Sequence, residues 1–571
     1  MSTCCDVASG RLFLGYRHCV MFLGLCGLAI CYIMRISPAI TIISMVDNKE
    51  YRSANITGNN SGSAKKFDWT PLEQNTILSS FFYSYFLMQL PAGWVTQHIG
   101  GKWTFATGVS FCGLIAIVLP RLVELGGFTA FLLLRISQGL FQGMCYPSIH
   151  RLTGYWYPPR EYSLLSGIMH SGAFVRYGAH LFLDLPGSSS HAYLHYTDAV
   201  PVSDTRVVDY QFLSNVIKIS WPHVHSANLT LRLILPYLVN FYPYPQGYIV
   251  GTVLALVCSG YLIDANQLGG WPLPFYVSGI LAFIWLPAWS ILITEVPGSH
   301  PWISPEEVQY IEGSLRDIHP PRPRAIPWRR LAASGQVWLI MVCYVLDGWS
   351  NYTLLVCVPQ FIHDVLGVPI SENGVLSALP YMMALIFMYL LTAIDGFILR
   401  RGWISMPNAR KLWSGLSAFG KSILLLTIAY LDASHKTAII ILLVLNVMLS
   451  SATLLGFNLA DLDLAPAYAG FLFSVFNACS TFSGIVAPLV VGVFTSNYPA
   501  PTAWRNVFVL ASAISCLCGI LFVLFGRQAP LSWTRLEHTQ RRRISNSDVL
   551  RSVESDQSTT DVHARLLEGS S

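Results

Sequence analysis

The stretch FLLLRISQGLFQGMCYP, residues 131–147, places one arginine, Arg135, inside an otherwise apolar run. Arginine effectively never loses its proton in a protein. Even the low estimates of the cost of an arginine at the centre of a bilayer are roughly 2.5–3.5 kcal/mol. Charged residues in such runs are therefore associated with function, and this stretch predicts a membrane helix whose arginine has a task.

The composition agrees with a chain that crosses the membrane many times. Hydrophobic residues make up 53% of the 571 residues, charged residues only 11%, and the mean hydropathy is +0.49. A soluble chain carries roughly 25% charged residues. The apolar runs are too long and continuous for barrel strands, so they predict helices. The 13 cysteines are scattered without the spacing of a metal site.

The apolar runs predict an all-α membrane protein with twelve spans in two six-helix halves. The expected spans are 18–46, 76–97, 102–122, 128–148, a fifth starting near Leu164, 272–294, 334–358, 374–398, 411–432, 437–457, 467–494 and 504–526. The chain then divides into an N-terminal tail 1–17, a first half 18–294, a polar linker 295–333, a second half 334–526 and a disordered tail 527–571.

Positive charge predicts the orientation of these spans. Arginine and lysine gather after the fourth span, in the linker 295–333, after the eighth span and in the tail 527–571. The positive-inside rule makes this side cytosolic, so both termini are expected in the cytosol. The loop 47–75 then faces the lumen or the exterior, where its two N-x-S/T sequons predict glycosylation at Asn55 and Asn59.

The segment 175–246 interrupts the fifth span. Its 72 residues are rich in Tyr, His and Pro and have no sustained period. A loop of this length inside a span is unusual. We interpret it as a retained intron, since Val175 is encoded by GTN, Gln246 can be CAG, and pyrimidine-rich codons precede it. The alternative is a genuine extramembrane insertion.

Two six-helix halves resemble the arrangement of the major facilitator superfamily. The loop PAGWVTQHIGGKW, residues 91–103, is similar to that superfamily's G-x-x-x-D-R-x-G-G-K motif, with Gln97 where an acid is usual. A counterpart, LTAIDGFILRR, follows the eighth span. The resemblance assigns a conformational role to Gly93, Gly100, Gly101, Lys102 and Asp395.

Four longer stretches resemble the anion:cation symporter family, which includes sialin, vesicular glutamate and nucleotide transporters and sodium–phosphate cotransporters. They are LLLRISQGLFQGMCYPSIH, WYPPREYSLLSGIMHSGAF, ISENGVLSALPYM and GFNLADLDLAPAYAGFLFSVFNACSTFSGIVAP. ISENGVLSALPYM and LDLAPAYAGFL look most like sialin. The likeness implies transport of a small anion by alternating access around a site near the bilayer midplane.

Within this resemblance, Arg135 and Arg35 are the candidates for holding the anion. The family's helix-4 pattern R-x-x-x-G-L-x-x-G directs its arginine into the central cavity, and a second arginine occurs in the first span, here in ICYIMRISPAI. A guanidinium can hold a carboxylate or a phosphate through two parallel hydrogen bonds. Asn458, at the end of the tenth span, is a further candidate for the cavity wall.

Coupling to an ion gradient requires other side chains. Gln142 stands where sialin-like members have a glutamate, and it cannot titrate. His150 matches a histidine of sialin and the glutamate transporters, and a histidine changes charge near neutral pH. Asp347 offers a site for a proton or a cation, or an ion-pair partner for Arg35 or Arg135.

The sequence is thus interpreted as a proton-coupled, sialin-like symporter of organic anions. A sodium-coupled phosphate or anion cotransporter is the first alternative, and an inactive membrane protein is the second if 175–246 is translated. No P-loop, zinc cluster or nucleophile elbow indicates an enzyme. We expect no cofactor beyond the proton or sodium ion, no nucleic-acid partner, a monomer in the bilayer, and a lysosomal, vesicular or plasma-membrane location.

Overall fold

Helices dominate the computed structural model, which describes residues 15–46, 65–158, 246–264, 270–316, 327–465, 468–527 and 530–531. Within these residues there is no strand, and one isolated bridge joins Val46 to Phe67. The predicted all-α fold is therefore confirmed. The sequons at Asn55 and Asn59, nearly all of the segment 175–246 and nearly all of the tail 527–571 lie outside the described residues.

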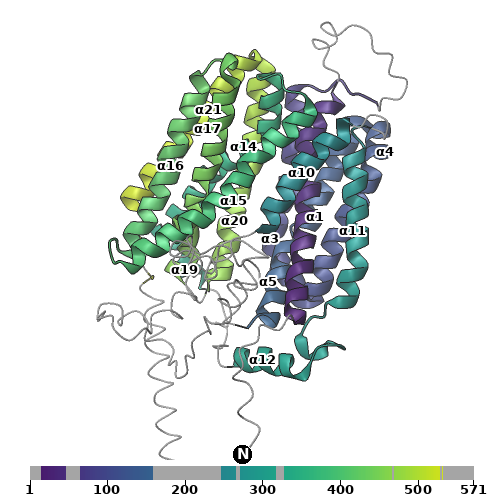
Figure 1. Ribbon diagram of the computed structural model, residues 1–571, viewed down its shortest axis with the longest axis vertical. Coiled ribbons are helices and arrows are strands. Elements are labelled where there is room, and N and C mark those ends of the chain that lie inside the picture. Colours follow the sequence, from purple (N-terminus) through teal and green to yellow (C-terminus); the bar gives the residue numbers. More distant parts are fainter. Residues whose placement is uncertain are drawn as a thin grey trace, which may run out of the picture.

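Two groups of helices stand side by side, one purple to teal and the other green to yellow (Figure 1). The first contains α1 (Tyr16–Met45), α3 (Pro71–Ile99), α4 (Gly101–Gln142), α5 (Cys145–Trp156), α10 (Gln246–Asp264) and α11 (Leu273–Leu292). The second contains α14 (Gly335–Asp364), α15 (Ile370–Arg400), α16 (Met406–Tyr430), α17 (Lys436–Ser450), α18 (Ala452–Leu455), α19 (Ala460–Leu464), α20 (Ala469–Asn497) and α21 (Ala500–Phe525). We call them the N half and the C half.

The helix α4 is a hairpin that folds back at Gly127. This glycine has φ 57° and ψ −138°, a conformation that side chains other than glycine rarely adopt. The Sγ atom of Cys112 lies 3.4 Å from the carbonyl oxygen of Gln138, although 26 residues of straight helix would separate them by roughly 39 Å. The two predicted spans 102–122 and 128–148 are the arms of this hairpin.

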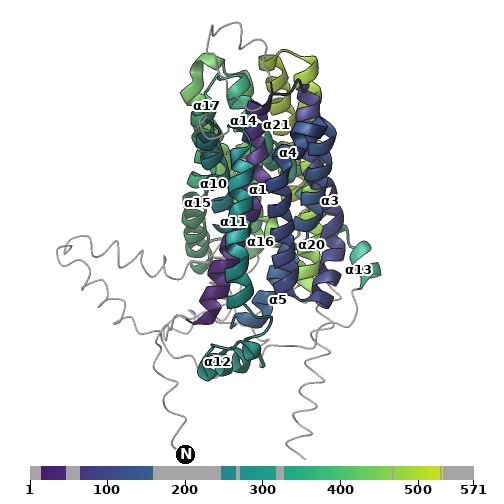
Figure 2. The ribbon, with the colours of Figure 1, turned by 90° about the vertical axis from the view of Figure 1, so that its right-hand side faces the viewer.

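Nine segments of the described chain are long and apolar enough to cross a membrane, and Gly101–Trp156 is counted once among them. The shorter α10 and the more polar α3 complete the N half. The count of twelve spans stays a prediction. The linker 295–333 is not fully irregular, because it contains α12 (Pro305–Arg316) and α13 (Trp328–Ala332). Figure 2 shows α12 beneath the bundle, at the end where α1 begins, which we call the lower end.

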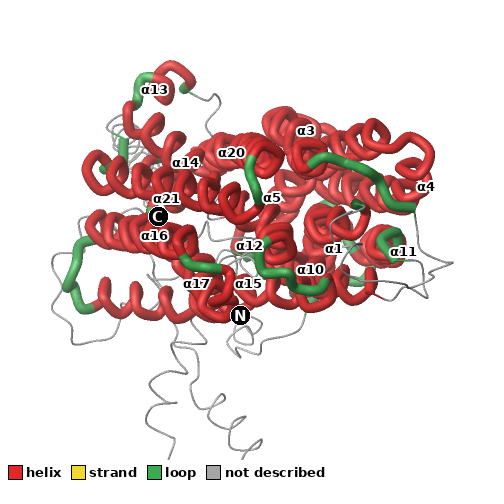
Figure 3. Tube along the Cα trace, turned by 90° about the horizontal axis from the view of Figure 1, so that it is seen from above, coloured by secondary structure: helices red, strands yellow, loops and turns green. Residues whose placement is uncertain are grey.

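The halves are in direct contact towards the opposite, upper end, where α1 ends and α3 begins. There Asn75 Nδ2 donates to Gln360 Oε1 at 3.2 Å. A Cβ atom added at Gly374 of α15 would lie 2.5 Å from the carbonyl oxygen of Leu256 in α10. Seen from above, the two groups adjoin along one seam (Figure 3). The upper end of this seam is therefore closed by direct backbone packing.

Glycines in the Arg135 stretch let α4 approach α3. A Cβ atom at Gly139 would lie 2.0 Å from the carbonyl oxygen of Phe81, and one at Gly143 would lie 2.9 Å from the Cβ of Met88. Contacts this short do not occur between real Cβ atoms and backbone, so only glycine fits. This packing brings Phe81 and Arg135 into one layer of the N half.

Substitution of Gly139 by alanine should separate α3 from α4. Overpacking costs roughly 1–3 kcal/mol, and the better helix propensity of alanine offsets up to about 1 kcal/mol of it. We expect Gly139→Ala to lower the unfolding temperature in detergent. Gly154→Ala is the matched control, because a Cβ atom there meets nothing within 4 Å; equal stability of the two variants would contradict the close approach.

Candidate functional site

Arg35 lies in a cage of aromatic rings within the N half. Its Cζ atom is 4.2 Å from the ring centroid of Tyr85, 4.7 Å from Phe81, 5.0 Å from Tyr32 and 5.5 Å from Phe82. The residue is only 6% exposed, and its Nε and Nη2 atoms have no hydrogen-bond partner among the described residues. The rings stabilise the cation through their π faces, but they leave two donors unused.

A small cavity adjoins Arg35. Its volume is about 10 Å³, close to the space of one water molecule. The side chains around it come from α1, α3, α4 and α5: Leu28, Cys31, Tyr32, Arg35, Tyr85, Gln142, Cys145 and Tyr146. The cavity is thus in the N half, the surface that faces it is apolar, and in this conformation it has room for about one water molecule.

Arg135 is buried behind the cavity and does not line it. The residue is 1% exposed. Its Nη2 donates to the carbonyl oxygen of Arg35 at 3.2 Å, and its Nη1 donates to that of Met34 at 3.4 Å and to Gln138 Oε1 at 3.1 Å. Arg135 also lies 4.9 Å from the ring centroid of Phe81. The two predicted arginines therefore share an aromatic neighbour but have different surroundings.

The structure separates the other two helix-4 candidates. Gln142 lines the cavity, and its Nε2 donates to the carbonyl oxygen of Cys31 at 2.8 Å. His150 lies further along the chain, in α5, with its ring 6.5 Å from that of Tyr146 and 5.9 Å from that of Phe473. Because Phe473 belongs to α20, His150 lies where the two halves face each other.

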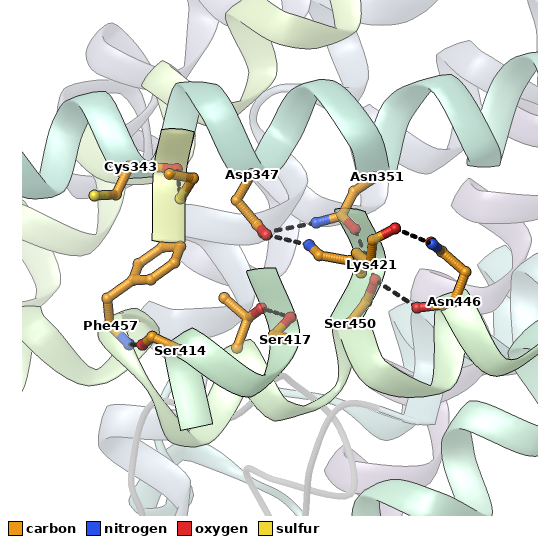
Figure 4. A network of polar contacts seen from close by, with 11 residues as sticks. Cys343, Asp347, Asn351, Ser414, Ser417, Lys421, Asn446, Ser450 and Phe457 are labelled. Carbon is orange, nitrogen blue, oxygen red and sulfur yellow. Dashed lines mark hydrogen bonds and ion pairs between the residues drawn. The ribbon is translucent and has the colours of Figure 1, made fainter. Parts of the chain in front are cut away.

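Asp347 forms an ion pair with Lys421 in the C half, not with Arg35 or Arg135. Asn351 Nδ2 donates to the second carboxylate oxygen at 2.8 Å. Both charged residues are buried, with exposed fractions of 8% for Asp347 and 0% for Lys421. The network continues through Ser450, whose Oγ donates to Asn351 Oδ1 at 3.1 Å (Figure 4). The hypothesis that Asp347 pairs with one of the two arginines is wrong in this conformation.

The remaining predicted residues take structural positions. Asn458 lies in the short turn Phe457–Leu459 of the C half, and its carbonyl oxygen accepts from the hydroxyl of Tyr344 at 3.2 Å. Asp395 is buried and accepts a hydrogen bond from Trp413 Nε1 at 2.6 Å. Gly93 is in α3, where an added Cβ atom would meet nothing within 4 Å. None of these three lines the cavity near Arg35.

The motif around Lys102 forms an anion-binding helix start that a glutamate of this chain fills. Gly100 adopts φ 93°, which favours glycine, and α4 begins after it. The amides of Gly101 and Lys102 each donate to the Glu295 carboxylate at 2.9 Å, and Arg151 Nε donates to it at 2.9 Å. Partial burial opposes ionisation of Glu295, but these hydrogen bonds outweigh it and hold its pKa below the ordinary value.

Three features of the site escaped the sequence analysis. The aromatic run SSFFYSYF, residues 79–86, supplies three of the rings around Arg35. Such a run facing an intramembrane arginine could have indicated the cage. Lys421 has a partner that sequence spacing does not identify, since Asp347 is 74 residues away. Glu295 supplies the acid that Gln97 lacks, from a different helix end.

The comparisons with known proteins agree with this architecture. The sequence model of the Major Facilitator Superfamily matches residues 21–178 and 246–488. Sialin of Ovis aries is 27% identical, over 92% of each chain. A putative inorganic phosphate cotransporter of Drosophila melanogaster is 25% identical, over 92% of this chain and 88% of the relative. These relatives confirm the resemblance to the anion:cation symporters.

A solved structure of similar fold is a bacterial homologue of the human lysosomal transporter Spinster in an inward-facing and occupied conformation. It is 13% identical, has a TM-score of 0.55, and the match covers 90% of this chain and 97% of that one. At this identity the likeness concerns the fold alone. The chain belongs to the major facilitator superfamily, and it is not an enzyme.

Replacement of Glu295 by glutamine should weaken the lower end of the N half. The lost charge-assisted hydrogen bonds and partial exposure suggest a cost of roughly 1–2 kcal/mol. Since the pKa of Glu295 is lowered in the folded state, its contribution is present above its ordinary pKa and is lost as the pH falls through the folded pKa. Thermal unfolding of wild type and Glu295→Gln should therefore differ at pH 7 and converge in acid; a gap that persists in acid would contradict this.

Proposed function

We propose that this member of the major facilitator superfamily is a secondary active transporter that binds its anion at Arg35. In this proposal the halves 18–294 and 334–526 rock against each other around the cavity. The observation that carries it is the arginine itself. Arg35 is buried, lines the cavity, and has two donors without partners among the described residues.

An anion is the guest that completes this arrangement. A buried charge is costly unless it is paired and hydrogen-bonded. No carboxylate of the described residues lies within ion-pair distance of Arg35 or Arg135. Carboxylates and phosphates can accept two parallel hydrogen bonds from one guanidinium. The empty donors of Arg35 therefore favour a small carboxylate or phosphate over a sugar or a cation.

The relatives suggest two kinds of cargo. A sialin-like, proton-coupled carrier of organic anions is the first proposal, and a sodium-coupled carrier of inorganic phosphate is the second. An inactive protein is the third if residues 175–246 are translated. Purified protein in liposomes, given a proton or a sodium gradient and a panel of sialic acid, glutamate, nucleotide and phosphate, distinguishes them. Stimulation by neither gradient favours the inactive protein.

The Asp347–Lys421 pair supports the proposal of proton coupling. A proton on the Asp347 carboxylate would cancel its charge and release Lys421 and Asn351 from it. Within the described part of the chain, Tyr344 and Cys518 face this pair, with Asp461 near Tyr344 and Cys343 beside Cys518. Gln142 cannot take this role, because an amide does not titrate. Asp347 is thus the proposed proton site, in the half that does not hold the anion.

Loss of the Arg35 guanidinium should strongly reduce uptake. Each hydrogen bond to a charged group is worth about 1.5–3 kcal/mol, so Arg35→Gln should reduce initial uptake into proteoliposomes by roughly 100-fold. Arg35→Lys keeps the charge without the planar fork, so its initial uptake should lie between those of wild type and Arg35→Gln. Arg121→Gln is the control, because Arg121 is exposed beside Glu124 on the hairpin and should not matter. Normal uptake by Arg35→Gln would remove Arg35 from the site.

Neutralising Asp347 should affect proton-driven accumulation of the anion but not its binding. We expect Asp347→Asn to lose proton-driven accumulation while it still exchanges labelled for unlabelled anion across the liposome membrane. The reason is that the asparagine cannot change its charge, whereas the Arg35 cavity in the other half is intact. A purely structural ion pair predicts a different result, in which exchange, accumulation and the unfolding temperature all decline together.

A further inference from the structure

A proline interrupts α1 three residues after the binding arginine. Pro38 lies inside the helix Tyr16–Met45. Proline has no amide hydrogen, so the carbonyl four residues earlier, that of Met34, has no donor within the helix. The hydroxyl of Ser37 also bonds back to the carbonyl oxygen of Ile33 at 2.7 Å, a pattern that often bends helices. The helix is therefore weakened in the segment that carries Arg35.

Arg135 supplies the missing donor. Its Nη1 points to the carbonyl oxygen of Met34 at 3.4 Å, a long hydrogen bond, and its Nη2 points to that of Arg35 at 3.2 Å. Prolines are tolerated in membrane helices where neighbouring side chains satisfy the freed backbone groups. The guanidinium of Arg135 satisfies α1 in this way, because it donates hydrogen bonds to two adjacent carbonyl oxygens of one turn.

The environment of Arg135 leaves it little freedom for a second task. Gln138 Oε1 accepts from the same Nη1 at 3.1 Å, which fixes the plane of the fork. Only Nε remains without a partner among the described residues. The residue does not line the cavity, whereas Arg35 does. Direct binding of cargo by Arg135 would require its bonds to α1 to break first.

We propose that Arg135 is a positioning residue, which replaces the amide hydrogen that Pro38 lacks and so aims Arg35 into the cavity. This inference rests on the proposed function in that Arg35 is the residue being aimed. The bond between Arg135 and the α1 backbone does not depend on transport. Arg135 and Pro38 should therefore be energetically coupled, and each should matter less when the other is changed.

The test is a double-mutant cycle in which alanine at position 38 restores the backbone donor. Arg135→Met removes every donor at similar length and should reduce uptake into proteoliposomes by roughly tenfold or more. Pro38→Ala in that background should recover a large part of the loss, because the helix again satisfies Met34. A double variant as inactive as Arg135→Met would overturn the proposal and return Arg135 to direct binding of the anion.

A matched control and a second readout keep the outcomes apart. Pro38→Ala combined with Arg35→Gln should show no recovery, since restoring the backbone cannot replace the ligand. The four proteins of the cycle are wild type, Arg135→Met, Pro38→Ala and the double variant. They are also compared by thermal unfolding in detergent, where Arg135→Met should be less stable than the double variant. If no protein transports any anion, the proposed function fails, but the thermal cycle still decides the coupling. Additive effects in that cycle would contradict it.

Discussion

The interior of the N half contains positive charge that no acid of the described chain neutralises. Arg35 and Arg135 lie 4.7 Å and 4.9 Å from the ring centroid of the same Phe81. Like charges this close in a dry interior repel each other strongly. Aromatic faces and backbone carbonyls disperse the charge but do not cancel it. In the proposed function, an anion bound beside Arg35 would supply the missing negative charge.

The C half is organised in the opposite way. Its buried cations have carboxylate partners, as Lys421 has Asp347 and Arg410 has Asp463 at 3.2 Å. A half with compensated charges does not need a guest, but a proton can change it by neutralising one partner. This difference fits the proposed symporter, in which the anion and the coupling ion would act on different halves.

The sequence was sufficient for the fold and for the identity of the charged candidates, because both depend on local signals. Apolar runs predicted the spans, and Arg35, Arg135 and Asp347 were visible as charges within them. Partners were not visible. Lys421 of α16 meets Asp347 of α14 in the C half, where both helices pack against α21, and Glu295 reaches Gly101 from the end of α11. The different roles proposed for Arg35 and Arg135 also depend on Pro38, and the sequence does not show which side chain lies opposite it.

The glutamine at position 142, where the resemblance to sialin implies a glutamate, is consistent with this difference between the halves. A glutamate at this position, which the resemblance to sialin implies, would sit at the cavity that Arg35 lines and would compensate part of its charge. It would then compete with the anion for the same guanidinium unless it were protonated, which is one way to couple binding to a proton. The amide of Gln142 instead donates to the carbonyl oxygen of Cys31 and leaves Arg35 without a carboxylate partner among the described residues. With a neutral group at the cavity, the proposed proton coupling needs another carboxylate, and Asp347, buried beside Lys421 in the C half, is the one proposed for it.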